Sequence, residues 1–173
     1  MAAQNNHQYI NEDSVVNLVL ALGEDDLDQL TRVLSQNQSL KTINIKGSLK
    51  SLNKIIPIIA KIPTLEELLI ESNQCVSSVL RFLTKCQNLR WLSFPSLFDY
   101  TFAQHLASFL KTDPSVQEII LKPISGNILS DYHYSIINEG VKMNTRLRSL
   151  KGYTHLQSSK NTSLVKTGIS KTC

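Results

Sequence analysis

The segment Leu65-Glu66-Glu67-Leu68-Leu69-Ile70 carries large apolar residues at its first, fourth and sixth positions. Leu68 and Ile70 stand two residues apart, as side chains on one face of a strand do. The same spacing recurs at intervals of 25, 25, 24, 27 and 31 residues. A short strand is therefore predicted in each of a series of repeating units. The segments with this spacing begin at Val15, Leu40, Leu65, Leu89, Val116 and, in a degenerate form, Leu147.

Between these segments, apolar residues recur at helical spacing. Offsets of three and four residues place three such side chains of each unit on one face of a helix. Each unit is therefore predicted to be a strand, a loop and an amphipathic helix, and only stacked units bury the helix face in a continuous core. The side chains of this stripe are Leu27, Leu30 and Leu34; Leu52, Ile55 and Ile59; Val76, Val79 and Leu83; Ala103, Leu106 and Leu110; and Tyr134, Ile137 and Val141.

These spacings resemble the leucine-rich-repeat family, and within it the ribonuclease-inhibitor class, which pairs LxxLxL strands with full α-helices. That class often has Asn or Cys three residues before the first strand leucine. Asn37, Cys86 and Asn144 occupy this position, Asp113 is a polar equivalent, and Ile62 departs from it. A short polar side chain there can satisfy backbone groups at the end of a helix.

The resemblance implies an α/β fold, namely a leucine-rich-repeat solenoid of about five to six repeats shaped as a curved horseshoe segment. A parallel β-sheet would line its concave face and α-helices its convex face. Residues 1–14 are expected to form an N-terminal cap or flexible segment. Residues 15–153 are expected to form the repeat domain, and residues 154–173 a basic polar tail that is a cap or disordered.

The resemblance also implies that a partner protein binds the concave face. Strand alternation turns the residues between and just after the apolar triplets toward it. Trp91, the only tryptophan, then lies between Glu67 and Glu118, with Leu69 and Ile120 in the adjacent row. An apolar centre with a charged border is typical of a protein-binding hot spot. In the alternative, Trp91 only covers backbone of the neighbouring strands. The other candidates on this face are Thr42, Asn44, Lys46, Glu71, Ser93, Lys122, Lys151 and Tyr153.

Two long strand-to-helix segments, 95–102 and 123–134, predict aromatic-rich loops on one rim of the array. Phe98, Tyr100 and Tyr132 lie in them. Insertions in repeat arrays map to one rim and often extend the binding face. The alternative is that these side chains pack on each other and close the long loops.

The sequence offers little for catalysis or for a cofactor. The three cysteines, Cys75, Cys86 and Cys173, are odd in number and have no CxxC spacing, which argues against a disulfide framework and a zinc site. Phosphate-binding, zinc-protease and nucleophile-elbow motifs are absent, and the four histidines are scattered. The chain is therefore predicted to be no enzyme and to hold no cofactor or metal.

Charge is distributed unevenly along the chain. Residues 1–139 sum to −3 and residues 140–173 to +7, within a net charge of +4. One alternative function is therefore attachment to nucleic acid or to an anionic membrane through the basic tail. Another is that the chain is the substrate-recruiting segment of a larger enzyme such as a ubiquitin ligase.

Composition and hydropathy also bear on the compartment. Apolar residues make up 42% and charged residues 18% of the chain, as in folded proteins. No apolar run approaches the roughly 20 residues that span a bilayer, and the N-terminus lacks the order of a signal peptide. We expect a monomeric cytoplasmic protein whose partner is another protein rather than nucleic acid or membrane. Small arrays of this family include proteins that intracellular bacteria deliver into host cells, and for such an effector the compartment would be the host-cell cytosol.

Overall fold

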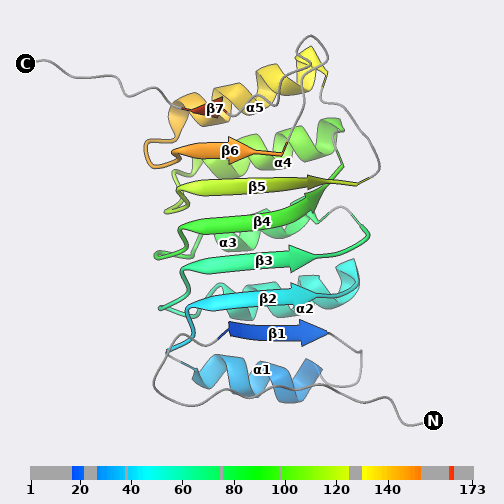
Figure 1. The fold of residues 1–173 in the computed structure, drawn as a ribbon, viewed down its shortest axis with the longest axis vertical. Coiled ribbons are helices and arrows are strands. Elements are labelled where there is room, and N and C mark those ends of the chain that lie inside the picture. Colours follow the sequence, from blue (N-terminus) through cyan, green and yellow to red (C-terminus); the bar gives the residue numbers. More distant parts are fainter. Residues whose placement is uncertain are drawn as a thin grey trace, which may run out of the picture.

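The structure is a computed structural model, and it describes residues 17–21, 27–37, 39–74, 76–97, 99–124, 130–152 and 164–165. Within these residues, seven strands form one open sheet in chain order, β1-β2-β3-β4-β5-β6-β7 (Figure 1). Neighbouring strands from β1 to β6 run parallel, and β7 runs antiparallel to β6. The strands are β1 Asn17–Ala21, β2 Thr42–Lys46, β3 Glu67–Glu71, β4 Trp91–Ser96, β5 Glu118–Pro123, β6 Ser149–Lys151 and β7 Leu164–Val165.

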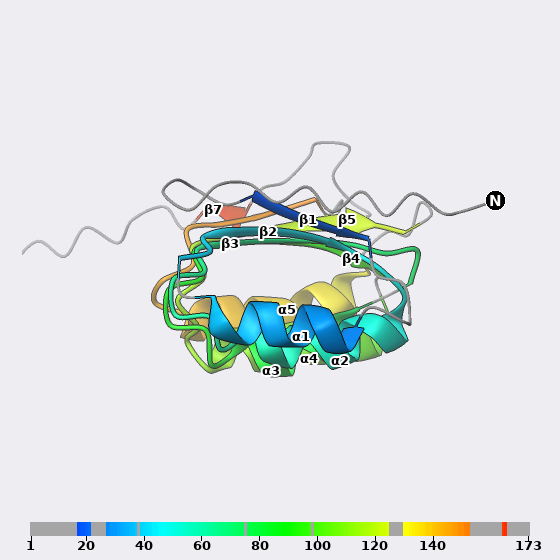
Figure 2. The same ribbon diagram turned by 90° about the horizontal axis from the view of Figure 1, so that it is seen from below.

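The helices lie in one layer against one face of this sheet (Figure 2). Each described helical segment follows one strand and returns the chain to the start of the next, as parallel strands require. The prediction of an α/β fold with a parallel sheet is therefore confirmed. The helical segments are α1 Leu27–Gln36, α2 Leu49–Ile59, the 3₁₀ turn η1 Ser77–Val79, α3 Leu80–Leu83, α4 Tyr100–Lys111 and α5 Asp131–Met143.

The core lies between the sheet and the helices. Leu65, Leu68 and Ile70 are buried, and the register aligns Leu68 of β3 with Ile43 of β2 and Leu92 of β4. Full burial of one such side chain contributes about 1.5–3 kcal/mol. The core stripe predicted for the strands is therefore confirmed in β2 to β6. Its other buried members are Leu40, Ile43 and Ile45; Leu89, Leu92 and Phe94; Val116, Ile119 and Leu121; and Leu147 and Leu150.

The helix between β3 and β4 is much shorter than the repeat pattern predicts. It consists of the three-residue η1 and the four-residue α3. Ser77 and Ser78 disfavour helix because their hydroxyl groups compete for backbone groups, and no side chain caps either segment. Val76 and Val79 nevertheless stay buried as predicted. The prediction of a full α-helix in this unit is wrong, whereas the prediction of its buried face is confirmed.

Asn144 ties the end of α5 to β6. Its side chain is fully buried, and Nδ2 donates to the Leu110 carbonyl at 3.2 Å. Its Oδ1 accepts from the N–H groups of Arg146 at 2.9 Å and Leu147 at 2.6 Å. Asn37, at the same place in the first unit, accepts from the N–H groups two and three residues ahead at 3.0 and 2.9 Å. At Asn37 and Asn144, the polar side chain before the strand therefore bonds the backbone of its own turn, as expected.

Cys86 occupies the same position before β4. Its Sγ donates to the Ala60 carbonyl at 3.6 Å, and the side chain is buried. Burial raises the pKa of the Cys86 thiol to about 12. The thiol is therefore protonated near neutral pH, which fits a structural role rather than that of a nucleophile.

Asp113 fills this position before β5, and its backbone is left-handed with φ 51°. Its Oδ1 accepts from the Thr145 N–H at 2.8 Å, and its Oδ2 accepts from the Thr145 hydroxyl at 2.8 Å. Arg146 Nε lies 3.9 Å from Oδ2. These hydrogen bonds, followed by the Arg146 charge, hold the pKa of Asp113 below its ordinary value of 3.8.

The lowered pKa of Asp113 predicts a pH-dependent loss of stability. A carboxyl whose pKa is lower in the folded state contributes its stability above the unfolded-state pKa and loses it as pH falls through the folded-state pKa. In urea unfolding, wild type should therefore have a larger free energy of unfolding than Asp113→Asn at pH 6, and this difference should shrink as the pH falls below the ordinary Asp pKa of 3.8. Asparagine tolerates the left-handed backbone, so the variant removes the charge without straining the turn. A difference that is constant across this pH range would contradict the assignment.

Candidate functional site

Trp91 lies in the middle of the sheet face that points away from the helices. Its strand neighbours Leu92 and Phe94 are buried beneath the sheet, so alternation turns Trp91 to the opposite face. Its side chain is partly exposed. The register places its Cα beside those of Glu67 in β3 and Glu118 in β5, as predicted. We call this side of β2 to β6 the open sheet face.

The row next to Trp91 on the open sheet face is apolar at its centre. Leu69 of β3 and Ile120 of β5 flank Ser93 of β4 in register, and both are partly exposed. Asn44 of β2 and Lys151 of β6 continue this row to its ends. The structure therefore brings together an indole ring and two aliphatic side chains, as the sequence predicts.

Charged groups border this centre and are partly paired. Lys151 Nζ lies 2.7 Å from Glu118 Oε1, and the Thr42 hydroxyl donates to Glu67 Oε2 at 3.4 Å. Exposed pairs of this kind contribute little to stability, at most about 1 kcal/mol. Each of the two carboxylates on either side of Trp91 therefore has a polar partner on a neighbouring strand.

The third predicted row lies where the strands end. Lys46 and Lys122 are exposed and Glu71 is partly exposed. Glu71 and Lys122 line a depression of about 350 Å³, together with Pro95. Pro95 is itself buried, so this row offers two charged side chains around a hollow rather than a continuous polar strip.

Ser93 differs from the prediction that it faces a partner. It is buried, with no exposed surface. Its short side chain has the larger Leu69 and Ile120 as its register neighbours on the two adjacent strands. Among the described residues, its hydroxyl has no hydrogen-bond partner. Alternation therefore gives the direction of Ser93 correctly, but the side chain is not available for contact. Tyr153, also predicted on this face, lies outside the described residues.

Tyr100 and Tyr132 belong to helices rather than to the predicted rim loops. Asp99 Oδ1 accepts from the Phe102 N–H at 2.7 Å and caps α4, and Ser130 caps α5. These caps start each helix before the tyrosine, which is why the loop prediction is wrong for both residues. The rings stack at 6.0 Å with an interplanar angle of 11°, and they are 46% and 62% exposed. They therefore pack on each other, one of the two alternatives. Phe98 lies outside the described residues.

One pair of side chains on the helix side has the residue types of a catalytic dyad. Ser77 Oγ and His105 Nδ1 lie 3.1 Å apart, beside a depression of about 180 Å³. Ser77 is buried, and among the described residues no carboxylate pairs with His105 to orient its ring. A hydrolytic triad needs such a group. In the part of the chain that the structure describes, no three His, Cys, Asp or Glu side chains gather as a metal site. No helix in that part is long and apolar enough to cross a bilayer.

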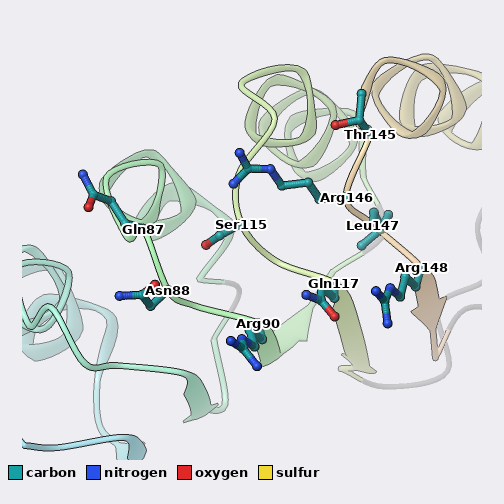
Figure 3. A pocket seen from close by; sticks show the side chains of 9 residues that line it. All are labelled: Gln87, Asn88, Arg90, Ser115, Gln117, Thr145, Arg146, Leu147 and Arg148. Carbon is teal, nitrogen blue, oxygen red and sulfur yellow. The ribbon is translucent and has the colours of Figure 1, made fainter.

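A second surface feature, which the repeat pattern did not predict, lies at the edge where the strands begin. It is a polar groove of about 590 Å³, which we call the arginine groove. Figure 3 shows Arg90 and Arg148 extending from two strand starts, with Gln117 between them and Arg146 nearby. The lining residues are Gln87, Asn88, Arg90, Ser115, Gln117, Thr145, Arg146, Leu147 and Arg148.

No model of a known protein family matches the chain, and no curated protein sequence matches it either. Function is therefore inferred from the open sheet face and the arginine groove themselves. A fold of this kind supports many functions, so function depends on the side chains at these two places.

Proposed function

We propose that the chain is a non-enzymatic leucine-rich-repeat protein of the ribonuclease-inhibitor type that binds another protein through its open sheet face. The observation that carries the proposal is the position of Trp91. This partly exposed indole lies between Glu67 and Glu118 and next to the row of Leu69 and Ile120. Large side chains of this type dominate binding energy when a polar border excludes water around them.

The repeat assignment is supported by the register of the sheet. Equivalent positions of successive units are Cα partners across β2 to β6, for example Leu68 with Leu92 and Ile119 with Leu150. The turn hydrogen bonds of Asn37 and Asn144 also recur at equivalent positions. Units that repeat in this way would present their outward side chains in straight rows, and a partner could contact several rows at once.

The character of the face favours a protein over a small molecule. Partly exposed apolar side chains at the centre with carboxylates and lysines around them match the core and rim of a protein interface. A small-molecule site is instead a concave pocket that encloses most of its ligand. The depression of about 350 Å³ beside Glu71 and Lys122 lies at the edge of the face rather than under Trp91.

Trp91→Ala is expected to weaken partner binding by about 2 kcal/mol or more, roughly 30-fold, because it removes the largest apolar contact at the centre of the face. The measurement is affinity capture from a cell lysate with immobilised wild type and variant, followed by quantitative mass spectrometry. Proteins retained by wild type and lost with Trp91→Ala are the expected partners.

Met143→Ala provides the matched control, because Met143 is a large apolar side chain on α5 that is 59% exposed in the helix layer. It should retain the same proteins as wild type. Equal recovery by wild type and Trp91→Ala, with both chains folded by circular dichroism, would rule out the open sheet face as the binding surface.

A further inference from the structure

The arginine groove is built from the residue that directly precedes each strand. Arg90, Gln117 and Arg148 occupy this place before β4, β5 and β6. The ladder joins them in order, because Gln117 N donates to the Arg90 carbonyl at 2.8 Å and Arg148 N donates to the Gln117 carbonyl at 2.7 Å. The three side chains therefore stand side by side at one edge of the sheet (Figure 3).

The guanidinium groups of Arg90 and Arg148 are available to a ligand. Both residues are exposed, and among the described residues neither guanidinium group has a hydrogen-bond or ion-pair partner. Arg146 differs from them, because Asp113 holds its Nε at 3.9 Å. No carboxylate belongs to the nine lining residues. Within the part of the chain that the structure describes, the groove therefore presents two planar cations without a charged partner, and such cations suit the geometry of a carboxylate.

The rest of the lining is suited to a peptide backbone. Gln87 and Gln117 place amide groups in the groove, and such groups can donate to and accept from peptide bonds. Asn88 and Ser115 link the groove wall to preceding turns, since Asn88 Nδ2 donates to the Pro63 carbonyl at 2.6 Å and Ser115 Oγ donates to the carbonyl of Cys86 at 2.9 Å. The lining residues include no aromatic side chain. A single-stranded nucleic acid would thus find no aromatic side chain on which to stack its bases.

We propose that the arginine groove binds an acidic, extended segment of a protein, with Arg90 and Arg148 each pairing with one carboxylate. Adjacent strands lie about 4.8 Å apart. The Cα atoms of the two arginines, which are two strands apart, are therefore separated by about 10 Å. A polyproline II chain brings residues i and i+3 to the same side at about 9 Å. The groove therefore fits two acidic residues three positions apart. This site goes beyond the proposed function and does not depend on Trp91.

The test uses a fluorescein-labelled peptide, Gly-Glu-Pro-Pro-Glu-Gly, and fluorescence anisotropy with the full chain at low ionic strength. Wild type should bind it saturably. The double variant Arg90→Gln/Arg148→Gln should bind at least about tenfold more weakly, because both charge-assisted pairs are lost. The double variant Arg32→Gln/Lys54→Gln removes the same charge from exposed positions on α1 and α2 and should stay within about twofold of wild type.

Several results would overturn the proposal. They are no saturable binding by wild type, equal weakening in both double variants, equal affinity for the peptide with both Glu replaced by Gln, or tighter binding of a uridine hexanucleotide through the same arginines. Circular dichroism establishes that each variant is folded. Trp91→Ala should bind the peptide as wild type does, so a failure of the open sheet face and a failure of the groove give different results.

Discussion

Asn144→Ala should lower the free energy of unfolding by about 3 kcal/mol. The side chain is fully buried and makes three hydrogen bonds, to the Leu110 carbonyl and from the N–H groups of Arg146 and Leu147. Alanine leaves these backbone groups unpaired in or near the core, at about 1–3 kcal/mol for each buried group. The measurement is guanidinium unfolding followed by circular dichroism, with the denaturant slope compared between variants.

Two other variants make this prediction specific. Asn37→Ala removes the equivalent side chain from the first unit, where the site is only partly buried, and should cost about 1 kcal/mol. The loss of free energy of unfolding in Asn144→Cys should lie between those of Asn144→Ala and Asn37→Ala. Cys86 at the equivalent position donates only one hydrogen bond, to the Ala60 carbonyl. If Asn144→Ala costs no more than Asn37→Ala, the buried hydrogen bonds are not what stabilises this turn.

Gly140→Leu is expected to destabilise the protein by about 3 kcal/mol, because α5 packs directly on the backbone of α4. A Cβ atom at Gly140 would lie 2.8 Å from the Ala107 carbonyl oxygen and 3.1 Å from Leu110 Cβ. Backbone atoms cannot move aside as a flexible side chain can, so the helices must separate. For a chain of this size the melting temperature should fall by about 6–12 °C, measured by thermal unfolding.

Ser135→Leu is the matched control on the same helix. Ser135 is exposed, so the same side chain there should change stability by no more than about 0.5 kcal/mol. The stability loss in Gly140→Ala should lie between those of Gly140→Leu and Ser135→Leu. Alanine has a better helix propensity than glycine by about 1 kcal/mol, and this offsets part of the clash. A Gly140→Leu variant as stable as Ser135→Leu would show that α4 and α5 do not pack closely here.

The apolar spacing predicts the strands well because burial and spacing have one physical cause. Side chains such as Ile43 and Ile45 must point to the same face to be buried, and this constraint also positions β2. The length of a helix depends on other terms. Between β3 and β4, Val76 and Val79 are buried as predicted. Two serines and the lack of a side-chain cap nevertheless leave only the 3₁₀ turn η1 and one turn of helix in α3.

For the candidate site, the sequence predicts which face of the sheet each side chain points to, but not how exposed that side chain is. Alternation turns both Trp91 and Ser93 to the open sheet face, but it cannot show that Ser93, with the larger Leu69 and Ile120 beside it, is fully buried. The loop prediction is wrong for the tyrosines of α4 and α5 because Asp99 and Ser130 are helix-capping residues. These residue types are also typical of loops, so the start of each helix was not evident from the sequence.

The arginine groove had a signal in the sequence that a wider alignment of the repeats would have found. Extending the repeat register one residue upstream of each strand gives Lys41, Glu66, Arg90, Gln117 and Arg148 in a single row. Lys41 and Glu66 form an ion pair, with Nζ 3.1 Å from Oε1, so their charges cancel. The positive charge of the row therefore lies at Arg90 and Arg148. Which charges remain unpaired depends on contacts between units, and the sequence alone does not supply these.

The chain order of the strands has a consequence for how the protein is made. Cα partners of β2 and β3 are 25 residues apart, and those of β5 and β6 are 31 residues apart. A ribosome adds about 5–20 residues per second, so it spends seconds on each interval, whereas local contacts form in microseconds. Each new strand and helix can therefore dock on its predecessor during translation. β7, in which Leu164 pairs with Leu150 of β6, would join the edge of the sheet last.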